Sequence, residues 1–235
     1  NSELFLVDLG LGKNRMGGSS LAQVYNQIGN EAPDLDDPDL FGKFFSLMNT
    51  FNKRGLISAY HDRSDGGALI TLLEMAFASR CGLDIKVSDL IFDLFNEELG
   101  CIIQVNNYNR EIVLNELARI GLNENTKSIA KVTDTDEIII YHDGNKVFQD
   151  KRYNLQKVWS STSYQISKLR DNPECAKSEN SELSKSSNGL KISPSFDINE
   201  IISAPYLDHQ VKPKIAILRE QGINGQIEMA AAFPK

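Results

Sequence analysis

Basic runs, long apolar runs and any surplus of cysteine are missing from this sequence of 235 residues. The formal net charge is -7, and no cluster of lysine and arginine balances it, which argues against nucleic acid as a partner. No apolar run is long enough to span a membrane, and the first residues do not begin a signal peptide. We therefore expect a cytoplasmic protein that binds neither nucleic acid nor a membrane.

The three cysteines, Cys81, Cys101 and Cys175, have no metal-ligand spacing and cannot all pair with one another. They indicate buried or incidental thiols in a reducing compartment. None of them stands in the strand–turn–helix context of a catalytic nucleophile, so none receives that role. The hydrophobic content of 41% and the charged content of 24% are typical of a globular protein.

The stretch that organises the chain is residues 60–67, Tyr-His-Asp-Arg-Ser-Asp-Gly-Gly, with a short strand predicted before it over residues 56–60. An apolar helix is predicted directly after it, over residues 68–80. Apolar residues recur there three and four positions apart, which predicts one buried stripe of Leu69, Leu72, Leu73, Ala76 and Phe77. A strand, a polar turn with two glycines and a helix form an anion-binding arrangement, because free N–H groups at the helix start point outward.

Two carboxylates, those of Asp62 and Asp65, lie beside this helix start. Acidic residues beside an anion site are favourable only if a cation such as Mg²⁺ bridges them to phosphate. The same Ser and Asp residues also suit an ordinary helix N-cap. The local pattern leaves both interpretations open.

A second strand, glycine loop and helix opens the chain. Residues 4–9 predict the strand, residues 10–20 the loop, and the next residues a helix that carries Leu21, Val24 and Ile28 and ends at Gly29. Lys13 and Arg15 are candidate phosphate partners in this loop. Its spacing fits neither a Walker A loop nor a dinucleotide fingerprint. The alternative is that the glycines serve only tight turns and a close approach of the helix.

The remaining pattern mixes strands and helices without a regular alternation. Pro38 begins a helix with a core-type apolar stripe that ends at Gly55. Glu97 and Glu98 are interpreted as a solvated turn rather than a ligand pair. Further strands are predicted over residues 83–87, 101–105, 127–133, 137–142 and 146–148, and further helices over 108–120 and 152–170. The pattern predicts an α+β domain with a mixed sheet packed with helices.

The composition changes after Leu169. Residues 171–195 are rich in Ser, Asn, Lys and Glu, and we expect a linker over 171–211. Near the end, residues 213–218 predict a strand and residues 226–233 a helix, which together cannot bury their own apolar faces. We therefore expect one domain over 1–170, the linker, and over 212–235 the first β–α element of a truncated domain. The chain is then a fragment of a longer protein.

Six motifs, taken in chain order, resemble those of one family: residues 11–23, 61–67, 95–100, 169–176, 196–200 and 218–225. It is the large, single-chain phosphoribosylformylglycinamidine synthase of purine biosynthesis, also called formylglycinamide ribonucleotide amidotransferase. The resemblance extends over nearly the whole chain. It implies that residues 1–170 have the fold of an aminoimidazole ribonucleotide synthetase C-terminal domain, and that residues 212–235 begin a class I glutamine amidotransferase domain.

The resemblance implies an ATP-dependent carbon–nitrogen ligase with glutamine as amido donor, which converts formylglycinamide ribonucleotide to formylglycinamidine ribonucleotide. In such an enzyme ATP phosphorylates an amide oxygen, and Mg²⁺ neutralises charge so that this oxygen leaves more easily. The position matching Asp62 is a Mg²⁺ ligand in the family, and the position matching Ser64 contacts the nucleotide, ATP or ADP. No catalytic residue carries over, because the glutaminase nucleophile would lie beyond Lys235. The remaining ligands would come from preceding synthetase domains.

Two hypotheses of different classes follow from the sequence. In the first, the chain is one wall of the amidotransferase ligase, inactive alone, and its nucleotide site is either catalytic or structural. In the second, the chain is a non-catalytic nucleotide-binding or scaffold module that acts with a partner chain.

Overall fold

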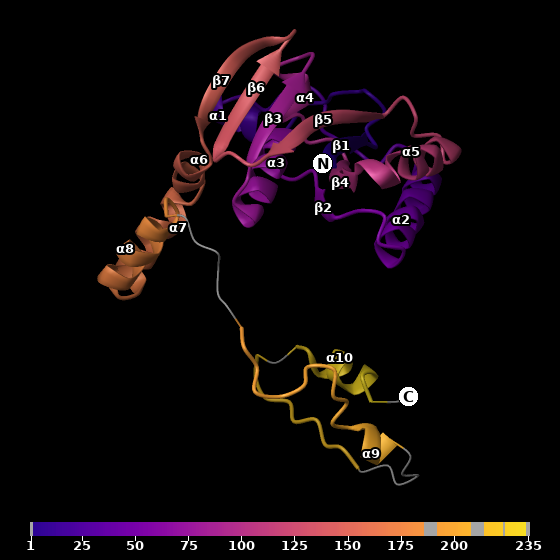
Figure 1. Ribbon diagram of the computed structural model, residues 1–235, viewed down its shortest axis with the longest axis vertical. Coiled ribbons are helices and arrows are strands. Elements are labelled where there is room, and N and C mark those ends of the chain that lie inside the picture. Colours follow the sequence, from indigo (N-terminus) through magenta and orange to yellow (C-terminus); the bar gives the residue numbers. More distant parts are fainter. Residues whose placement is uncertain (1, 186–191, 208–213, 223, 234–235) are drawn as a thin grey trace. The chain divides into compact units, whose positions relative to one another are not determined.

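The structure is a computed structural model that describes residues 2–185, 192–207, 214–222 and 224–233 (Figure 1). The chain divides into two units, Asn1–Ser186 and Ser187–Lys235. The first unit contains a seven-stranded sheet in the order β2-β4-β1-β5-β3-β6-β7. Its strands are β1 (Ser2–Asp8), β2 (Ala59–Asp62), β3 (Gly82–Val87), β4 (Gly100–Asn106), β5 (Thr126–Thr133), β6 (Glu137–His142) and β7 (Asn145–Lys151).

The sheet is mixed, as predicted. β3 and β6 pair in parallel, whereas the other neighbouring strands pair antiparallel. β1 lies between β4 and β5, and β2 forms one edge of the sheet, where Asp62 lies opposite Cys101. The turn between β6 and β7 places Asp143 at φ 50° and Gly144 at φ 79°, which is the backbone that a tight hairpin requires. These features confirm the predicted α+β fold.

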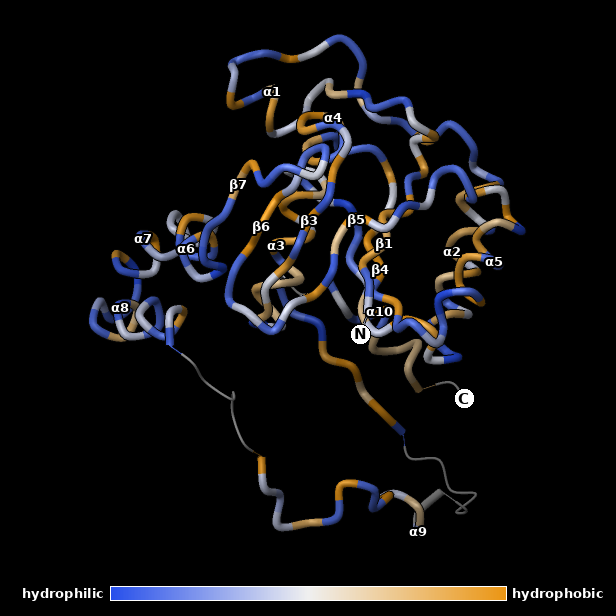
Figure 2. Tube along the Cα trace, turned by 45° about the horizontal axis from the view of Figure 1, so that its top comes forward, coloured by the Kyte–Doolittle hydropathy of each residue, from blue (hydrophilic) through white to orange (hydrophobic). Residues whose placement is uncertain are grey.

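Helices cover both faces of the sheet (Figure 1). Alternate residues of β1 enter the two cores: Leu4 and Leu6 pack with α3, α4 and α6, whereas Phe5 and Val7 pack with α2 and α5. Burial on both faces explains the nearly continuous apolar run of this strand, and Figure 2 shows hydrophobic stretches along the central strands. The helices that cover the sheet are α2 (Pro38–Lys53), α3 (Gly67–Ser79), α4 (Phe92–Phe95), α5 (Arg110–Arg119), which a short 3₁₀ turn precedes (Asn107–Asn109), and α6 (Arg152–Trp159).

The starts of α2 and α3 follow from local sequence. The Asp37 side chain accepts a hydrogen bond from Leu40 N at 2.9 Å, and Pro38 occupies the first helical position, so the predicted start of α2 is confirmed. α3 begins after Gly66, whose φ of 89° is left-handed and therefore favours glycine. The predicted stripe of α3 is buried except for Leu69, which is partly buried.

The first helix is shorter than its apolar pattern predicts. α1 (Ser20–Val24) ends because Asn26 adopts a left-handed φ of 54°, and Ile28 is 84% exposed, so the predicted extension to Ile28 is wrong. The chain then folds back, and Gly17 N donates to Glu31 O at 2.5 Å. A Cβ at Gly17 would lie 2.3 Å from Glu31 O. This glycine therefore permits a close backbone approach, in agreement with the structural alternative for the loop.

The predicted helix over 152–170 is two helices, α6 and α7 (Ser161–Arg170), which meet at Ser160. A further helix, α8 (Pro173–Glu182), begins at Asn172, whose side chain accepts from Glu174 N at 3.0 Å and from Cys175 N at 3.1 Å. α8 packs against α7 and buries Ala176. Part of the range expected as a linker is therefore helical and belongs to the first unit.

The second unit contains two short helices, α9 (Ala204–Leu207) and α10 (Gln226–Ala231). α10 agrees with the helix predicted over 226–233. The strand expected over 213–218 is not formed by the described residues 214–218, because no neighbouring strand pairs with them; Pro213 lies outside the described residues. The division into 1–170, 171–211 and 212–235 stays a prediction.

Candidate functional site

Asp62 ends the edge strand β2, and its side chain is exposed. The Tyr60 hydroxyl donates to Asp62 Oδ1 at 2.6 Å. Partial burial and the hydrogen bond to Asp62 raise the pKa of Tyr60, so the phenol stays a proton donor. The structure thus places the predicted metal ligand at the surface, with one carboxylate oxygen oriented by a neighbour.

Ser64 lies in the loop between β2 and α3, residues 63–66, which we call the second glycine loop. Its backbone N–H donates to Thr71 Oγ1 at 3.2 Å, which ties the loop to the first turns of α3. Its hydroxyl is inaccessible to solvent and has no hydrogen-bond partner among the described residues. A buried hydroxyl without a partner costs on the order of 1–3 kcal/mol, so the Ser64 hydroxyl is a candidate ligand contact.

A cavity of about 700 Å³ adjoins Asp62 and extends to α2. Phe41 and Phe45 of α2 line it together with Tyr60 and Asp62 of β2. Both phenylalanines are more than a third exposed, at 39% and 62%. The Asp62 carboxylate therefore lies between a polar loop and an apolar hollow.

Arg63 points into the protein, away from the surface on which its neighbour Asp62 is exposed. Its side chain is 1% exposed, and Nη2 donates to Asp8 Oδ1 at 2.5 Å. Nε donates to Glu98 O at 2.5 Å, and Nη2 also donates to Leu99 O at 3.0 Å. Arg63 therefore fixes the second glycine loop to the strands beneath it, a role that sequence reasoning missed.

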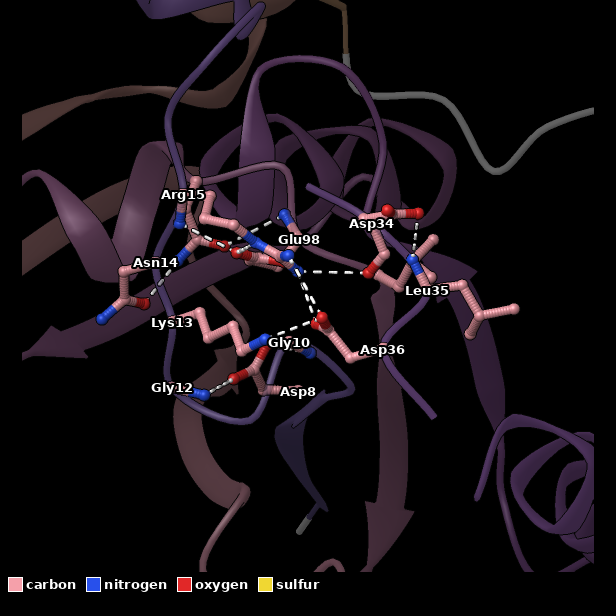
Figure 3. Close-up of polar contacts among 12 residues, drawn as sticks. Asp8, Gly10, Gly12, Lys13, Asn14, Arg15, Asp34, Leu35, Asp36 and Glu98 are labelled. Carbon is pink, nitrogen blue, oxygen red and sulfur yellow. Dashed lines mark hydrogen bonds and ion pairs between the residues drawn. The ribbon is translucent and has the colours of Figure 1, made fainter. Parts of the chain in front are cut away.

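Glu98 is completely buried and binds Arg15 through both carboxylate oxygens. Arg15 Nε donates to Oε1 at 2.7 Å, Nη2 donates to Oε2 at 2.7 Å, and Arg15 N donates to Oε1 at 2.8 Å (Figure 3). The hydrogen bond to Glu98 raises the pKa of Arg15, so its guanidinium stays charged. The expectation of a solvated turn at Glu98 is wrong, because the fold brings a cation and a backbone N–H to the buried carboxylate.

The two cations proposed as phosphate partners are paired within the chain. Arg15 Nη2 also binds Asp36 Oδ2 at 2.8 Å, and Lys13 Nζ binds Asp36 Oδ1 at 2.7 Å (Figure 3). The Asp36 pairs hold residues 9–19, which we call the first glycine loop, against residues 34–36, and the Glu98 contacts hold this loop against the turn at residues 96–99. Lys13 and Arg15 therefore hold the loop in place, and the structure does not support a phosphate role for them.

Glu97 bridges the starts of two helices. Its Oε1 accepts from Ser20 N at 2.8 Å and from Gly66 N at 2.7 Å. The amide of Gly66, which the sequence made a candidate anion contact, is thus bound to a carboxylate of the chain itself. In the sequence, this role of Glu97 was indicated only by the two adjacent acids before a buried strand, which we interpreted as a solvated turn.

An Mg²⁺ ion is commonly held by one or two protein carboxylates together with phosphate oxygens and water. The exposed Asp62 carboxylate fits one such ligand, and the unpartnered Ser64 hydroxyl fits a neighbouring contact to a nucleotide. Over the described ranges, no group of three or more His, Cys, Asp or Glu side chains could hold a metal ion. Among the described residues, Asp62 and Ser64 stay the candidate contacts, and no complete metal site is formed.

The three cysteines, Cys81, Cys101 and Cys175, differ in their exposure to solvent. Cys101 is buried, Cys81 is half-buried and Cys175 is exposed, and all three are free thiols. Burial raises the pKa of the Cys101 thiol, which keeps it protonated and unreactive.

Among the helices that the structure describes, none combines the length and the apolar character needed to cross a membrane.

The sequence model of the family described as AIR synthase related protein, C-terminal domain, matches residues 7–143, which is more than half of the chain. The chain belongs to this family. The match to the AIR synthase related C-terminal domain includes both glycine loops, Asp62, Ser64 and the Glu97–Glu98 pair.

Solved structures of similar fold come from Thermotoga maritima. PurL complexed with ATP aligns at a TM-score of 0.51 and 12% identity, over 64% of this chain and 25% of PurL. PurL complexed with FGAR aligns at a TM-score of 0.52 and 11% identity, over 66% of this chain and 27% of PurL. Phosphoribosylformylglycinamidine synthase II aligns at a TM-score of 0.50 and 11% identity, over 64% of this chain and 25% of the synthase. At these identities the likeness establishes the fold, and the AIR synthase related chain spans about a quarter of the length of these proteins.

Proposed function

We propose that this chain is part of an ATP-dependent ligase of purine biosynthesis that converts formylglycinamide ribonucleotide and glutamine to formylglycinamidine ribonucleotide. Asp62 is its Mg²⁺ ligand and Ser64 its nucleotide contact. Membership of the AIR synthase related family supports the proposal, as does the fold shared with PurL, which has been solved with ATP, ADP and FGAR. The observation that carries it is the inaccessible, unpartnered Ser64 hydroxyl, two residues from the exposed Asp62 carboxylate.

When bound, a Mg²⁺–nucleotide would supply the phosphoryl group that activates an amide oxygen and the charge that stabilises the transition state. Asp62 binds the cation through its carboxylate, which the Tyr60 hydroxyl orients at 2.6 Å. Ser64 provides one neutral hydrogen bond to the nucleotide. Arg63 contributes no ligand contact, because its guanidinium is buried against Asp8 and the carbonyls of Glu98 and Leu99.

The remaining parts of the reaction lie outside this chain in the proposal. Preceding synthetase domains supply the other metal and nucleotide ligands, and a glutaminase domain supplies ammonia from glutamine. The chain is then one wall of a cytoplasmic ligase and is inactive alone.

The proposal is tested in the full-length synthetase with Asp62→Asn and, as a matched control from the same turn, Asp65→Asn. We expect Asp62→Asn to weaken retention of Mg²⁺–ADP while the glutaminase reaction continues, because it removes a charged ligand and little else. Binding is measured by titration calorimetry at fixed Mg²⁺. Equal affinity of Asp62→Asn, Asp65→Asn and the unchanged protein would leave Asp62 without a metal role.

A second candidate is a non-catalytic nucleotide-binding or scaffold module that acts with a partner chain. The described part of the chain has no group of three or more metal-ligating side chains, which suits a module whose site is completed by ligands from a partner chain. The two candidates differ in ammonia-dependent turnover. Loss of turnover in Asp62→Asn supports a ligase with a catalytic site in this chain. Unchanged turnover with less bound ADP and a lower melting temperature fits either the module or a ligase whose nucleotide site is structural.

A further inference from the structure

Glu97 joins two loops that are far apart in the sequence. The two backbone donors that share its Oε1 are Ser20 N, at the first residue of α1, and Gly66 N, at the N-cap of α3. N–H groups at helix starts lack partners within their own helices. One carboxylate oxygen therefore satisfies two such groups and joins the start of α1, which follows the first glycine loop, to the second glycine loop.

The backbone that carries Glu97 is itself held in place. A Cβ at Gly67 would lie 2.6 Å from Leu94 O and 2.8 Å from Asn96 O, so the chain before Glu97 packs directly on the start of α3. The Asn96 side chain then accepts a hydrogen bond from Glu98 N at 3.2 Å. Because the backbone at Glu97 is fixed, the reach of its side chain decides whether Oε1 meets both donors.

The turn that Glu97 holds is the one that carries the candidate ligand contacts. Gly66 and Gly67 have φ values of 89° and 74°, so the backbone reverses between Ser64 and α3 in a conformation that few other residues adopt. The hydrogen bond from Gly66 N to Glu97 fixes this reversal at 2.7 Å. Thr71 Oγ1 also ties Asp62 and Ser64 to α3, so the Glu97 hydrogen bond acts on the Gly66 backbone that links Ser64 to the helix start.

We propose that Glu97 is a positioning residue, which holds Ser64 and Asp62 in the geometry that a Mg²⁺–nucleotide requires and does not touch the ligand. This inference rests on the proposed function. A positioning role depends on the reach and the acceptor oxygen of the side chain more than on its charge. Glutamine keeps both of these properties, whereas aspartate keeps the charge but is one methylene shorter and cannot reach both donors.

The test compares Glu97→Gln and Glu97→Asp in the full-length synthetase, with Glu111→Gln on the exposed side of α5 as a charge control. We expect Glu97→Asp to raise the Kd for Mg²⁺–ADP by about tenfold and Glu97→Gln by less than about threefold, as befits the loss or retention of the two hydrogen bonds. Amide hydrogen exchange supplies a second measurement without ligand. The Gly66 amide should exchange faster in Glu97→Asp and at the unchanged rate in Glu97→Gln.

An unchanged Kd in Glu97→Asp overturns the inference, and so does a Glu97→Gln protein that binds as weakly as Glu97→Asp, which would indicate a role for charge. If Glu97→Asp fails to fold, Glu97→Ala takes its place: a Kd within about threefold of the unchanged protein overturns the inference, whereas a rise of about tenfold beside the retained Kd of Glu97→Gln supports it. Asp62→Asn separates the two proposals. An unchanged Kd for Mg²⁺–ADP in Asp62→Asn contradicts the proposed function. A raised Kd in Asp62→Asn together with an unchanged Kd in Glu97→Asp contradicts only the positioning role.

Discussion

Arg63 donates to Asp8 Oδ1 at 2.5 Å, and this ion pair joins the loop after β2 to the last residue of β1. The Arg63 side chain is 1% exposed and the Asp8 side chain 11% exposed. Asp8 also accepts from Gly10 N at 3.2 Å and Gly12 N at 2.8 Å, so the same carboxylate orders the first glycine loop. A single buried pair therefore supports both glycine loops, with Asp62 exposed on the adjoining surface.

Removing one partner of this pair should destabilise the fold strongly. We expect Asp8→Ala to lower the free energy of unfolding by about 3–5 kcal/mol, because it leaves the buried Arg63 guanidinium without its counter-charge. Chemical denaturation monitored by circular dichroism measures the change. Glu111→Ala, at an exposed position of α5, serves as control and should stay within about 0.5 kcal/mol of the unchanged protein. A loss in Asp8→Ala no larger than in this control would show that the pair is dispensable.

Ser64→Ala should act in opposite directions on stability and on binding. In the nucleotide-free protein it removes a buried hydroxyl without a partner, so the free energy of unfolding should rise by roughly 1 kcal/mol. In the presence of Mg²⁺–ADP it removes one ligand hydrogen bond, so the Kd should rise about fivefold. Thermal melting with and without ADP measures both effects. A loss of stability without ligand would mean that the Ser64 hydroxyl has a partner in the protein.

Asp93 should contribute to stability in a pH-dependent way. Desolvation raises its pKa, but hydrogen bonds from Lys127 Nζ, Asp89 N and Ser88 outweigh it and hold the pKa at about 2, below the ordinary 3.8. The folded state therefore favours the ionised form. Its contribution is fully present above the ordinary pKa and is lost as the pH falls through the folded pKa.

The difference in unfolding free energy between the unchanged protein and Asp93→Asn should accordingly be constant above about pH 5 and shrink between about pH 4 and pH 2. Urea denaturation across this range measures it. Lys127→Met should narrow the difference, because it removes the hydrogen bond at 2.7 Å that lowers the pKa of Asp93. A difference that does not vary with pH would contradict the assignment.

Limited trypsin digestion should cut the second unit before it cuts α8. Lys214 and Arg219 are exposed and lie outside helices and strands, whereas Lys177 lies within α8, which packs against α7. Cleavage in a helix requires local unfolding, so it is slower at equal exposure. Mass spectrometry of early products should show fragments that retain α8. Cleavage after Lys177 before Lys214 would mean that α8 does not form a stable part of the first unit.

The sequence by itself determined the elements whose signals are local. Asp37 and Pro38 specify the start of α2, the apolar run over residues 4–9 predicts the first strand, and Asp143 with Gly144 specifies the last hairpin. The positions of Asp62 and Ser64, at the end of a strand and before a glycine-initiated helix, were also within its reach. Caps, turns and periodic stripes act over roughly one or two turns of chain, so their residues are sufficient to predict them.

Only the tertiary structure decided where the charged side chains go. Glu98 and Arg15 are 83 positions apart, and Glu97 and Ser20 are 77 positions apart, yet each pair is in direct hydrogen-bond contact. From the sequence, Glu97 and Glu98 were both interpreted as part of a solvated turn. In the fold, Glu98 is buried against Arg15, whereas Glu97 lies between two helix starts. A buried carboxylate is stable only when the fold delivers its partner, and no local pattern names a partner that lies so far along the chain.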